Sequence, residues 1–332
     1  MRLFILIFLL LPVFGFSQNA EVVKMYNKGV EAAKQKKHST AIAFYSEALK
    51  LDPLYTLAYY NRANSKMASK QYEKAIVDYS KCVKLQSDHA NAYYYKGYCE
   101  MKSERNQNAL TSFSKALKNN PELPKAYYYR GFIHMQTEEY NKAVRDFEAY
   151  TMRVKDNERA YYNMGVCYNK LDQTDKALSS FITAISFNGK YVPAFFEKAK
   201  IQYKKEEFDD AILSLNQLML IDPDFSNAKY YRAMSHLKMD NLDMAKSDFE
   251  TILKEDPSNK VALTNTAFIN IKSKNYEAAS QTYTQLIELD ESNKNYHLNR
   301  AISYINLENY RAALFDLSRV IELDPDHSEA AR

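Results

Sequence analysis

The fold is decided by two adjoining stretches, TLAYYNRANSKMASKQYEKAIVDYSKCVKLQSDH (residues 56–89) and ANAYYYKGYCEMKSERNQNALTSFSKALKNNPEL (residues 90–123). The two align over their whole length without a gap, so that Ala75 in the first corresponds to Ala109 in the second. An aromatic residue follows four positions after each of these alanines. The sequence therefore repeats with a period of 34 residues.

The same period runs from Val22 to His327 and fills nine units without an insertion or a deletion. Four residues after an alanine that recurs in every unit stands a large apolar side chain, which falls on the same face of a helix. Prolines close several units, and they lie at multiples of 34 residues from one another. The recurring alanines are Ala41, Ala75, Ala109, Ala143, Ala177, Ala211, Ala245, Ala279 and Ala313.

These columns predict a pair of antiparallel helices in each unit. Small residues let two helices approach closely, and the large side chain fills the space beside that contact. Proline ends the second helix because it lacks a backbone donor. The chain has only 6 glycines and 8 prolines, which favours long helices. The expected units are 22–55, 56–89, 90–123, 124–157, 158–191, 192–225, 226–259, 260–293 and 294–327, followed by a short tail, 328–332.

The 34-residue period, with its small, aromatic and proline landmarks, resembles the tetratricopeptide repeat family. The resemblance covers Val22 to His327. It implies an all-α fold, a right-handed α-solenoid superhelix of nine helix–turn–helix repeats, in which each repeat buries its apolar face against its neighbours. The departures are local: Ser87, Lys155, Gly189 and Glu291 stand where the family consensus has proline, and Lys229 and His297 stand near positions where it has a large residue.

The sequence carries no motif for a catalytic, cofactor or metal site. The glycines are too widely spaced for a phosphate-binding loop. No histidine stands three or four residues from another histidine or a cysteine, so we expect no metal ligand set, and His134 and His236 should pack between helices. The net charge of +4 gives no reason to expect nucleic acid. We expect a protein that is not an enzyme and needs no cofactor.

Residues 1–17 have the pattern of a signal peptide. Arg2 precedes an apolar run, Leu3–Phe14, and Gly15 and Ser17 supply small residues at the expected cleavage point. The run is shorter than the roughly 20 residues that span a bilayer. We expect cleavage after Ser17 and export to the periplasm or cell envelope of a Gram-negative bacterium, since the leader resembles those of exported Bacteroidota proteins. An uncleaved anchor in the inner membrane is the alternative.

The three cysteines, Cys82, Cys99 and Cys167, have the character of small core residues in helices. A disulfide between Cys82 and Cys99 stays open as an alternative in an oxidising compartment. The sequence does not set the geometry that such a bond needs.

The resemblance also implies a binding surface. In the family, the first helices of the repeats line a concave groove that usually holds an extended peptide or a partner helix. One groove column of this sequence carries seven aromatic residues in nine units, and tyrosine suits such a surface because it combines apolar area with a polar tip. The same rings could instead pack helix against helix, and both interpretations stay open. The residues expected to bind a peptide are Tyr60, Tyr94, Tyr98, Tyr128, Phe132, Tyr162, Phe196, Asn163, Lys170, Lys200 and Lys204.

The aromatic column is densest in units two to six, and Thr264 and Leu298 replace the rings in the last two units. The surface is therefore expected to bind mainly through the earlier repeats. We predict an interaction scaffold or adaptor that holds a peptide or protein partner of unknown identity in the groove. The alternative is a structural scaffold that forms a homodimer through the last repeat, where only five residues follow His327.

Overall fold

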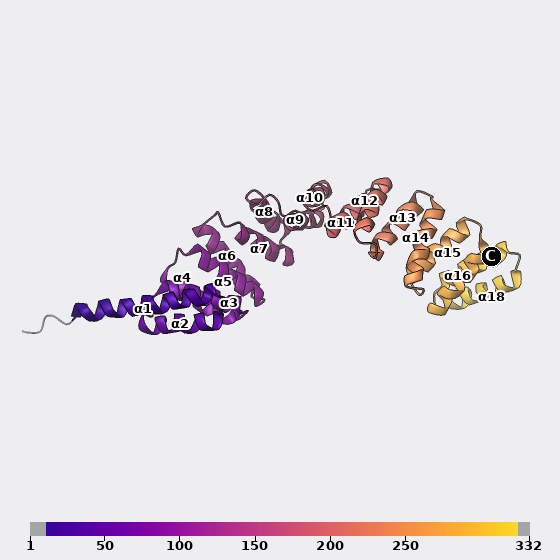
Figure 1. The fold of residues 1–332 in the computed structure, drawn as a ribbon. Helices are drawn as coiled ribbons and strands as arrows, with labels where there is room; N and C mark the ends of the chain where they lie inside the picture. Colours follow the sequence, from indigo (N-terminus) through magenta and orange to yellow (C-terminus); the bar gives the residue numbers. More distant parts are fainter. Residues whose placement is uncertain (1–10, 325–332) are drawn as a thin grey trace, which may run out of the picture. The chain divides into compact units, whose positions relative to one another are not determined.

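The structure, a computed structural model, describes residues 11–324, with side chains from residue 20 onward. Within this range eighteen α-helices follow one another without a strand, which confirms the predicted all-α class of repeated helix–turn–helix units. The odd-numbered helices are the first helices of the repeats and the even-numbered ones are the second helices (Figure 1). The helices are α1 (Leu11–Lys34), α2 (His38–Leu51), α3 (Thr56–Ala68), α4 (Tyr72–Leu85), α5 (Ala90–Lys102), α6 (Asn106–Asn119), α7 (Pro124–Gln136), α8 (Tyr140–Thr151), α9 (Glu158–Lys170), α10 (Thr174–Phe187), α11 (Val192–Lys204), α12 (Phe208–Ile221), α13 (Ser226–Lys238), α14 (Leu242–Glu255), α15 (Lys260–Lys272), α16 (Tyr276–Leu289), α17 (Lys294–Asn306) and α18 (Tyr310–Leu323).

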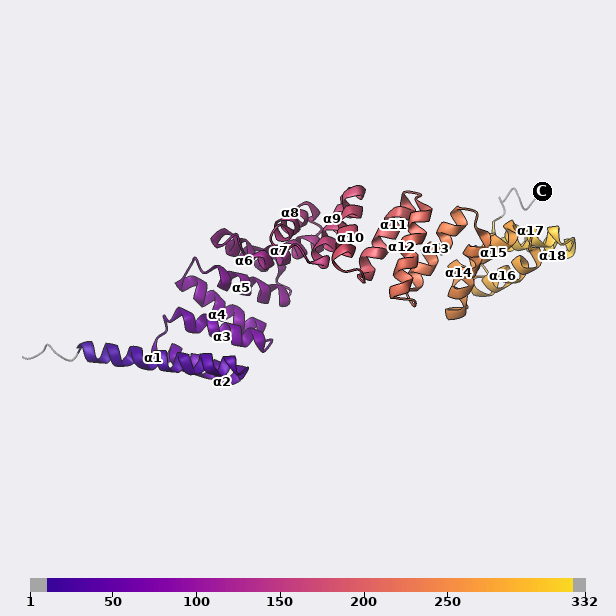
Figure 2. The same cartoon turned by 45° about the horizontal axis from the view of Figure 1, so that its top comes forward.

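The chain divides into two compact parts, the N-terminal part Met1–Ala177 and the C-terminal part Leu178–Arg332. Within each part, helices that are neighbours in sequence pack together, as α5 does with α4 and α6 (Figure 2). First helices of successive repeats also touch, as α5 and α7 do in the N-terminal part and α11 and α13 do in the C-terminal part. The first helices α1 to α9 of the N-terminal part therefore lie next to one another in order, and α11 lies next to α13 in the C-terminal part.

The core of each repeat is built on the columns that the sequence shows. Ala143 is fully buried and lets α7 and α8 approach, and the ring of Phe147 fills the space one turn further along α8. Gly131 of α7 lies so close to this contact that an added Cβ would stand 3.0 Å from the Asp146 Cβ and 3.3 Å from the Ala143 carbonyl oxygen. Small residues at these repeated positions are thus needed for the close approach of two helices.

The turn within each repeat contains one residue in the left-handed region of backbone space, and none of the nine is glycine. Lys70 is one of them, with φ at 58°, and its backbone N–H donates to the Met67 carbonyl, which closes the end of α3. This conformation costs a non-glycine residue about 1–2 kcal/mol. The others are Lys36, Glu104, Glu138, Asp172, Glu206, Asp240, Lys274 and Glu308.

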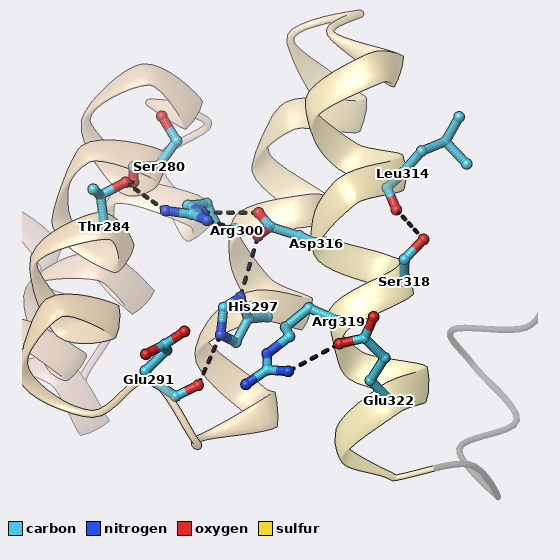
Figure 3. A network of polar contacts seen from close by, with 10 residues as sticks. All are labelled: Ser280, Thr284, Glu291, His297, Arg300, Leu314, Asp316, Ser318, Arg319 and Glu322. Atoms are coloured by element: carbon cyan, nitrogen blue, oxygen red, sulfur yellow. Dashed lines mark hydrogen bonds and ion pairs between the residues drawn. The ribbon is translucent and has the colours of Figure 1, made fainter.

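A buried arginine–aspartate pair ties the helices together in four repeats. In α17, Arg300 donates through Nε and Nη2 to both carboxylate oxygens of Asp316 on α18, at 2.8 and 2.7 Å, and its Nη1 donates to the Thr284 hydroxyl of the preceding repeat (Figure 3). This two-point geometry is the strong form of the pair, and it links three helices. The same arrangement is made by Arg62 with Asp78, Arg130 with Asp146 and Arg232 with Asp248.

His297 belongs to the same network in the last repeat. It stands on α17, where most other repeats place a large apolar or aromatic residue, and it is buried. Its Nδ1 lies 3.2 Å from Asp316 and its Nε2 lies 3.1 Å from the Glu291 carbonyl oxygen (Figure 3). A polar side chain fits at this core position because both ring nitrogens find partners.

The predicted leader and tail lie mainly outside the described residues. Residues 1–10 and 325–332 are not described, and the expected cleavage point after Ser17 falls inside α1, which is continuous there. Among the residues that the structure describes, no helix is both long enough and apolar enough to cross a membrane. Cys82, Cys99 and Cys167 are buried free thiols, so the alternative Cys82–Cys99 disulfide is not formed.

Candidate functional site

The first helices of the N-terminal part carry a cleft between α5 and α7. It has a volume of about 580 Å³, and its lining is Met101, Lys102, Glu104, Asn106, Phe132 and Gln136. Phe132, the one ring in this cleft, is among the residues predicted to bind a peptide, and it is half-buried. Apolar side chains of methionine and phenylalanine beside a lysine give this cleft area for an apolar ligand group and a cation for an acidic one.

The tyrosine column does not form one continuous exposed strip. Tyr60 and Tyr128 are half-buried, but Tyr94 is only 9% exposed and belongs to the core with Phe113. The expectation that Tyr94 lies open in the groove is therefore wrong. Its ring centroid stands 6.0 Å from that of Phe113 in the same repeat and 6.4 Å from that of Tyr129 in the next.

The burial of these rings has a common cause. Four rings of the column, Tyr26, Tyr60, Tyr94 and Phe196, sit where one repeat meets the next, and each contacts the residue 35 positions further along the chain. Tyr60 meets Tyr95 with centroids 6.3 Å apart, and the Tyr26 hydroxyl accepts a 2.7 Å hydrogen bond from Asn61. The column therefore contributes to packing between repeats, and only part of each half-buried ring faces solvent.

Burial also sets the chemistry of these phenols. Desolvation raises the pKa of Tyr60 to about 12, and it raises the pKa of Tyr128 as well. Both phenols are therefore neutral near pH 7, where each offers one O–H donor and acceptor lone pairs to a ligand.

The other selected residues of the N-terminal part differ in access. Tyr98 is half-buried, with the Lys102 ammonium 5.7 Å from its ring centroid, and Tyr162 is half-buried on α9. Lys170 is exposed at the end of α9. Asn163 is buried and hydrogen-bonded to Tyr128, so the expected groove position is wrong for Asn163 too.

The C-terminal part holds the remaining three selected residues, all on α11. Phe196 is half-buried and packs against Phe225, with ring centroids 5.0 Å apart. Lys200 lies 5.4 Å from the Phe196 ring centroid and donates to Glu197 at 2.9 Å. Lys204 is exposed. The structure thus brings Phe196 and Lys200 together, but it pairs the Lys200 charge within its own helix.

The residues predicted to bind a peptide leave out a more exposed set of apolar residues on later first helices. Val261 and Phe268 of α15 are 53% and 48% exposed, and Ile302 and Ile305 of α17 are 38% and 44% exposed. The signal was present in α15, whose sequence KVALTNTAFINIK places apolar residues on more than one face. The prediction was based on the aromatic column, in which α15 has Thr264 in place of a ring.

Beside Val261 lies a second cleft on the first helices. It has a volume of about 280 Å³ and is lined by Ser226, Asn227, Tyr230, Ile252, Asn259, Val261 and Ala262. These residues come from the first helices α13 and α15, from the second helix α14 and from the segment just before α15. Among the described side chains, no group of three or more histidine, cysteine, aspartate or glutamate residues could hold a metal ion.

Comparison with known proteins agrees with this architecture. Profiles described as Tetratricopeptide repeat match residues 56–89, residues 25–53, 158–191, 262–293 and 295–327, residues 100–152, and residues 227–259. No curated protein sequence matches the chain significantly.

Solved structures share the fold. A tetratricopeptide repeat protein from Cytophaga hutchinsonii has a TM-score of 0.62 at 16% identity, over 72% of this chain and 98% of its own. YrrB, described as a tetratricopeptide repeat protein with an unusual peptide-binding site, has a TM-score of 0.52 at 24% identity, over 55% of this chain and 95% of its own. A protein from Parabacteroides merdae has a TM-score of 0.51 at 15% identity, over 75% and 99% of the two chains. With its profile matches spread over most of the sequence, the chain belongs to the tetratricopeptide repeat family.

Proposed function

We propose that this protein is a non-enzymatic interaction scaffold that holds a peptide or protein partner on the exposed side of its first helices. The observation that carries the proposal is the cleft between α5 and α7, where Phe132, Met101 and Lys102 are gathered on two packed helices. Binding surfaces commonly combine a few apolar anchors with a polar rim. YrrB, which shares the fold, is described as binding a peptide.

The helix pairs suit a scaffold because they hold this surface in place. Each first helix is fixed by close contact at the small residues, and four repeats add the arginine–aspartate pair. A surface that is already ordered loses little conformational entropy when a partner binds.

The experiment is affinity capture from native cells, followed by direct binding measurements with the partner identified. Met101→Ala combined with Phe132→Ala should weaken binding at least about tenfold, or 1.4 kcal/mol, without loss of helicity. Val77→Ala on the second helix α4 is the matched control, because Val77 is exposed away from the cleft lining. Equal affinity of all three proteins would reject the cleft as the binding site.

We also propose that the scaffold works in the cell envelope after removal of residues 1–17. Support comes from the leader pattern, with Arg2 before the apolar run Leu3–Phe14. Mass spectrometry of the protein from its native envelope should find Gln18 at the N-terminus. An intact Met1 in the membrane fraction would favour the anchored alternative.

Self-association through α18 is the second candidate function. Tyr310, Leu314 and Phe315 are large apolar residues exposed on this helix, and exposed apolar patches commonly mark interaction sites. Light scattering should then report a dimer that Leu314→Glu with Phe315→Glu converts to a monomer. A monomeric wild-type protein would reject this candidate.

A further inference from the structure

In the second repeat, one buried aspartate accepts hydrogen bonds from two basic side chains. Asp78 is 2% exposed, and Arg62 donates to its two carboxylate oxygens through Nε and Nη2 at 2.8 and 2.7 Å. Lys66 donates to the same carboxylate at 2.6 Å. The arginine of the last repeat is bound in the same way by Asp316 (Figure 3). In these repeats the basic side chains therefore donate to acceptors of the protein itself.

The third repeat differs from the second at all three of these positions. The equivalent residues, 34 positions further along the chain, are Lys96, Glu100 and Ser112. Glu100 is only 2% exposed, and one of its carboxylate oxygens accepts a 2.6 Å hydrogen bond from the Ser112 hydroxyl. The Lys96 ammonium lies 3.4 Å from the other oxygen as an ion pair, and it makes no hydrogen bond to a described residue. The N–H groups of Lys96 are therefore open to another acceptor.

A cleft opens at this place between α5 and α6. It has a volume of about 190 Å³, and its lining includes Tyr93, Lys96 and Glu100 from α5 and Gln107, Asn108 and Lys115 from α6. It shares no residue with the cleft between α5 and α7. Clefts that hold drug-sized molecules have volumes of roughly 300–1,000 Å³, so this one suits a single small group of a ligand.

The polar groups of the cleft include several donors without an acceptor. The Lys115 ammonium lies 5.6 Å from the ring centroid of Tyr93 and has no acidic partner among the described residues. The side-chain amides of Gln107 and Asn108 make no hydrogen bond to a residue that the structure describes. Helix α6 contains no acidic residue. Two ammonium groups and the one carboxylate of Glu100 leave the cleft with a net charge of +1.

From these observations we infer that the cleft between α5 and α6 binds a single anionic group, the phosphate or the carboxylate of a small ligand. The anion accepts charge-assisted hydrogen bonds from Lys96 and Lys115, which are stronger than those between neutral groups. The amides of Gln107 and Asn108 donate to its remaining lone pairs. The site goes beyond the proposed scaffold function, because it lies on other residues and requires no partner protein.

The test is isothermal titration calorimetry of the purified protein at low salt, with inorganic phosphate and separately with acetate. Whichever anion binds more tightly identifies the chemistry of the group. Lys115→Gln should weaken this binding at least about tenfold, because it removes a charged donor. Lys81→Gln is the matched control, since Lys81 is exposed at the equivalent position of the second repeat, and it should leave binding unchanged.

A triple variant separates a specific site from general attraction by positive charge. Lys96→Arg with Glu100→Lys and Ser112→Asp gives the third repeat the residues of the second, which folds with them. The net charge rises by one, but the introduced aspartate accepts the hydrogen bonds of the introduced arginine. Anion binding should therefore fall at least about tenfold, as the loss of a charge-assisted hydrogen bond requires. Circular dichroism verifies that the variant retains its helices.

Three outcomes would overturn the inference. They are no binding of either anion to the wild-type protein, an equal loss in Lys81→Gln and Lys115→Gln, and undiminished binding by a folded triple variant. If the triple variant does not fold, the comparison of Lys115→Gln with Lys81→Gln decides. Capture of the partner by the Met101→Ala/Phe132→Ala variant tests the proposed function separately, because neither residue lines this cleft.

Discussion

At the scale of single residues, ion pairs with a buried aspartate join the helices. Asp146 is buried, and its carboxylate is matched by two donors of Arg130. Arg130 also donates to the Ser114 hydroxyl, 3.1 Å away in the preceding repeat. An arginine at this place thus holds its own repeat together and fixes the preceding one.

Replacing Arg130 with methionine should therefore destabilise the protein by about 3 kcal/mol, because it leaves a buried carboxylate without its partner. Adding Asp146→Leu to Arg130→Met should recover much of the loss, since no charge then stays buried. Arg145→Met is the control, because Arg145 is exposed on the same helix as Asp146. Urea unfolding measures all of these changes. A single Arg130→Met variant as stable as wild type would contradict the role of the pair.

A second prediction for single residues concerns the small residues at the contact between the two helices of a repeat. Gly131→Leu should destabilise by about 1–3 kcal/mol or more through overpacking, because the added side chain meets Asp146 and the Ala143 carbonyl at once. Gly189→Leu should have little effect, since an added Cβ at Gly189 meets no atom within 4 Å. Thermal unfolding of the two variants compares them directly, and equal melting temperatures would disprove the close contact.

At the scale of the helix and its ends, the turns carry a small and repeated strain. Lys70 adopts a left-handed conformation, with φ at 58°. Lys70→Gly should raise the free energy of unfolding by roughly 0.5–1 kcal/mol, because glycine relieves the strain but loses more entropy on folding. Lys74→Gly, at an exposed site inside α4, should instead lower it by about 1 kcal/mol. A loss of stability in both would show that the turn is not strained.

We expect the start of α5 to respond to pH through His89. His89 caps this helix through Nδ1, which accepts a 3.2 Å hydrogen bond from the Ala92 backbone N–H. Burial lowers the pKa of His89, and its ring centroid lies 4.7 Å from that of Tyr60. The cap requires a neutral imidazole, because a protonated Nδ1 cannot accept a hydrogen bond.

The unfolded state therefore binds the proton more readily than the folded state does, and stability falls as the pH drops below about 6.5. His89→Asn should keep the cap, as Asn157 and Asn259 do at α9 and α15, and remove this contribution. Urea unfolding between pH 8 and pH 5 measures the change. The free energy of unfolding should fall less with decreasing pH for the variant than for the wild type, because one titrating histidine is gone. Identical slopes would show that His89 does not titrate against folding.

At the scale of the whole molecule, periodicity predicted the fold because packing within a repeat is local in sequence. Ala143 and Phe147 stand four residues apart and pack as their spacing requires. The buried pair of Arg130 and Asp146 is also periodic, with the partners 16 positions apart in four repeats, but the predicted core was built from the small and apolar columns alone.

The candidate site was harder to predict because exposure depends on the next repeat. Tyr94 is buried because Tyr129 covers its ring, and a column of equivalent tyrosines does not reveal that cover. The exposed apolar residues of α15 were not among the predicted site residues. Thr264 interrupts the aromatic column in this helix, whereas Phe268 is exposed one turn later.

Site-specific photo-crosslinking in native cells tests most directly whether partners bind along the first helices. A photoreactive phenylalanine analogue would replace Phe132 or Phe268 on first helices, and Val77 or Leu213 on second helices, all of which the solvent can reach. We predict adducts of defined mass from position 132 or 268 and none from positions 77 and 213. Adducts that arise only from positions 77 and 213 would contradict the proposed binding surface.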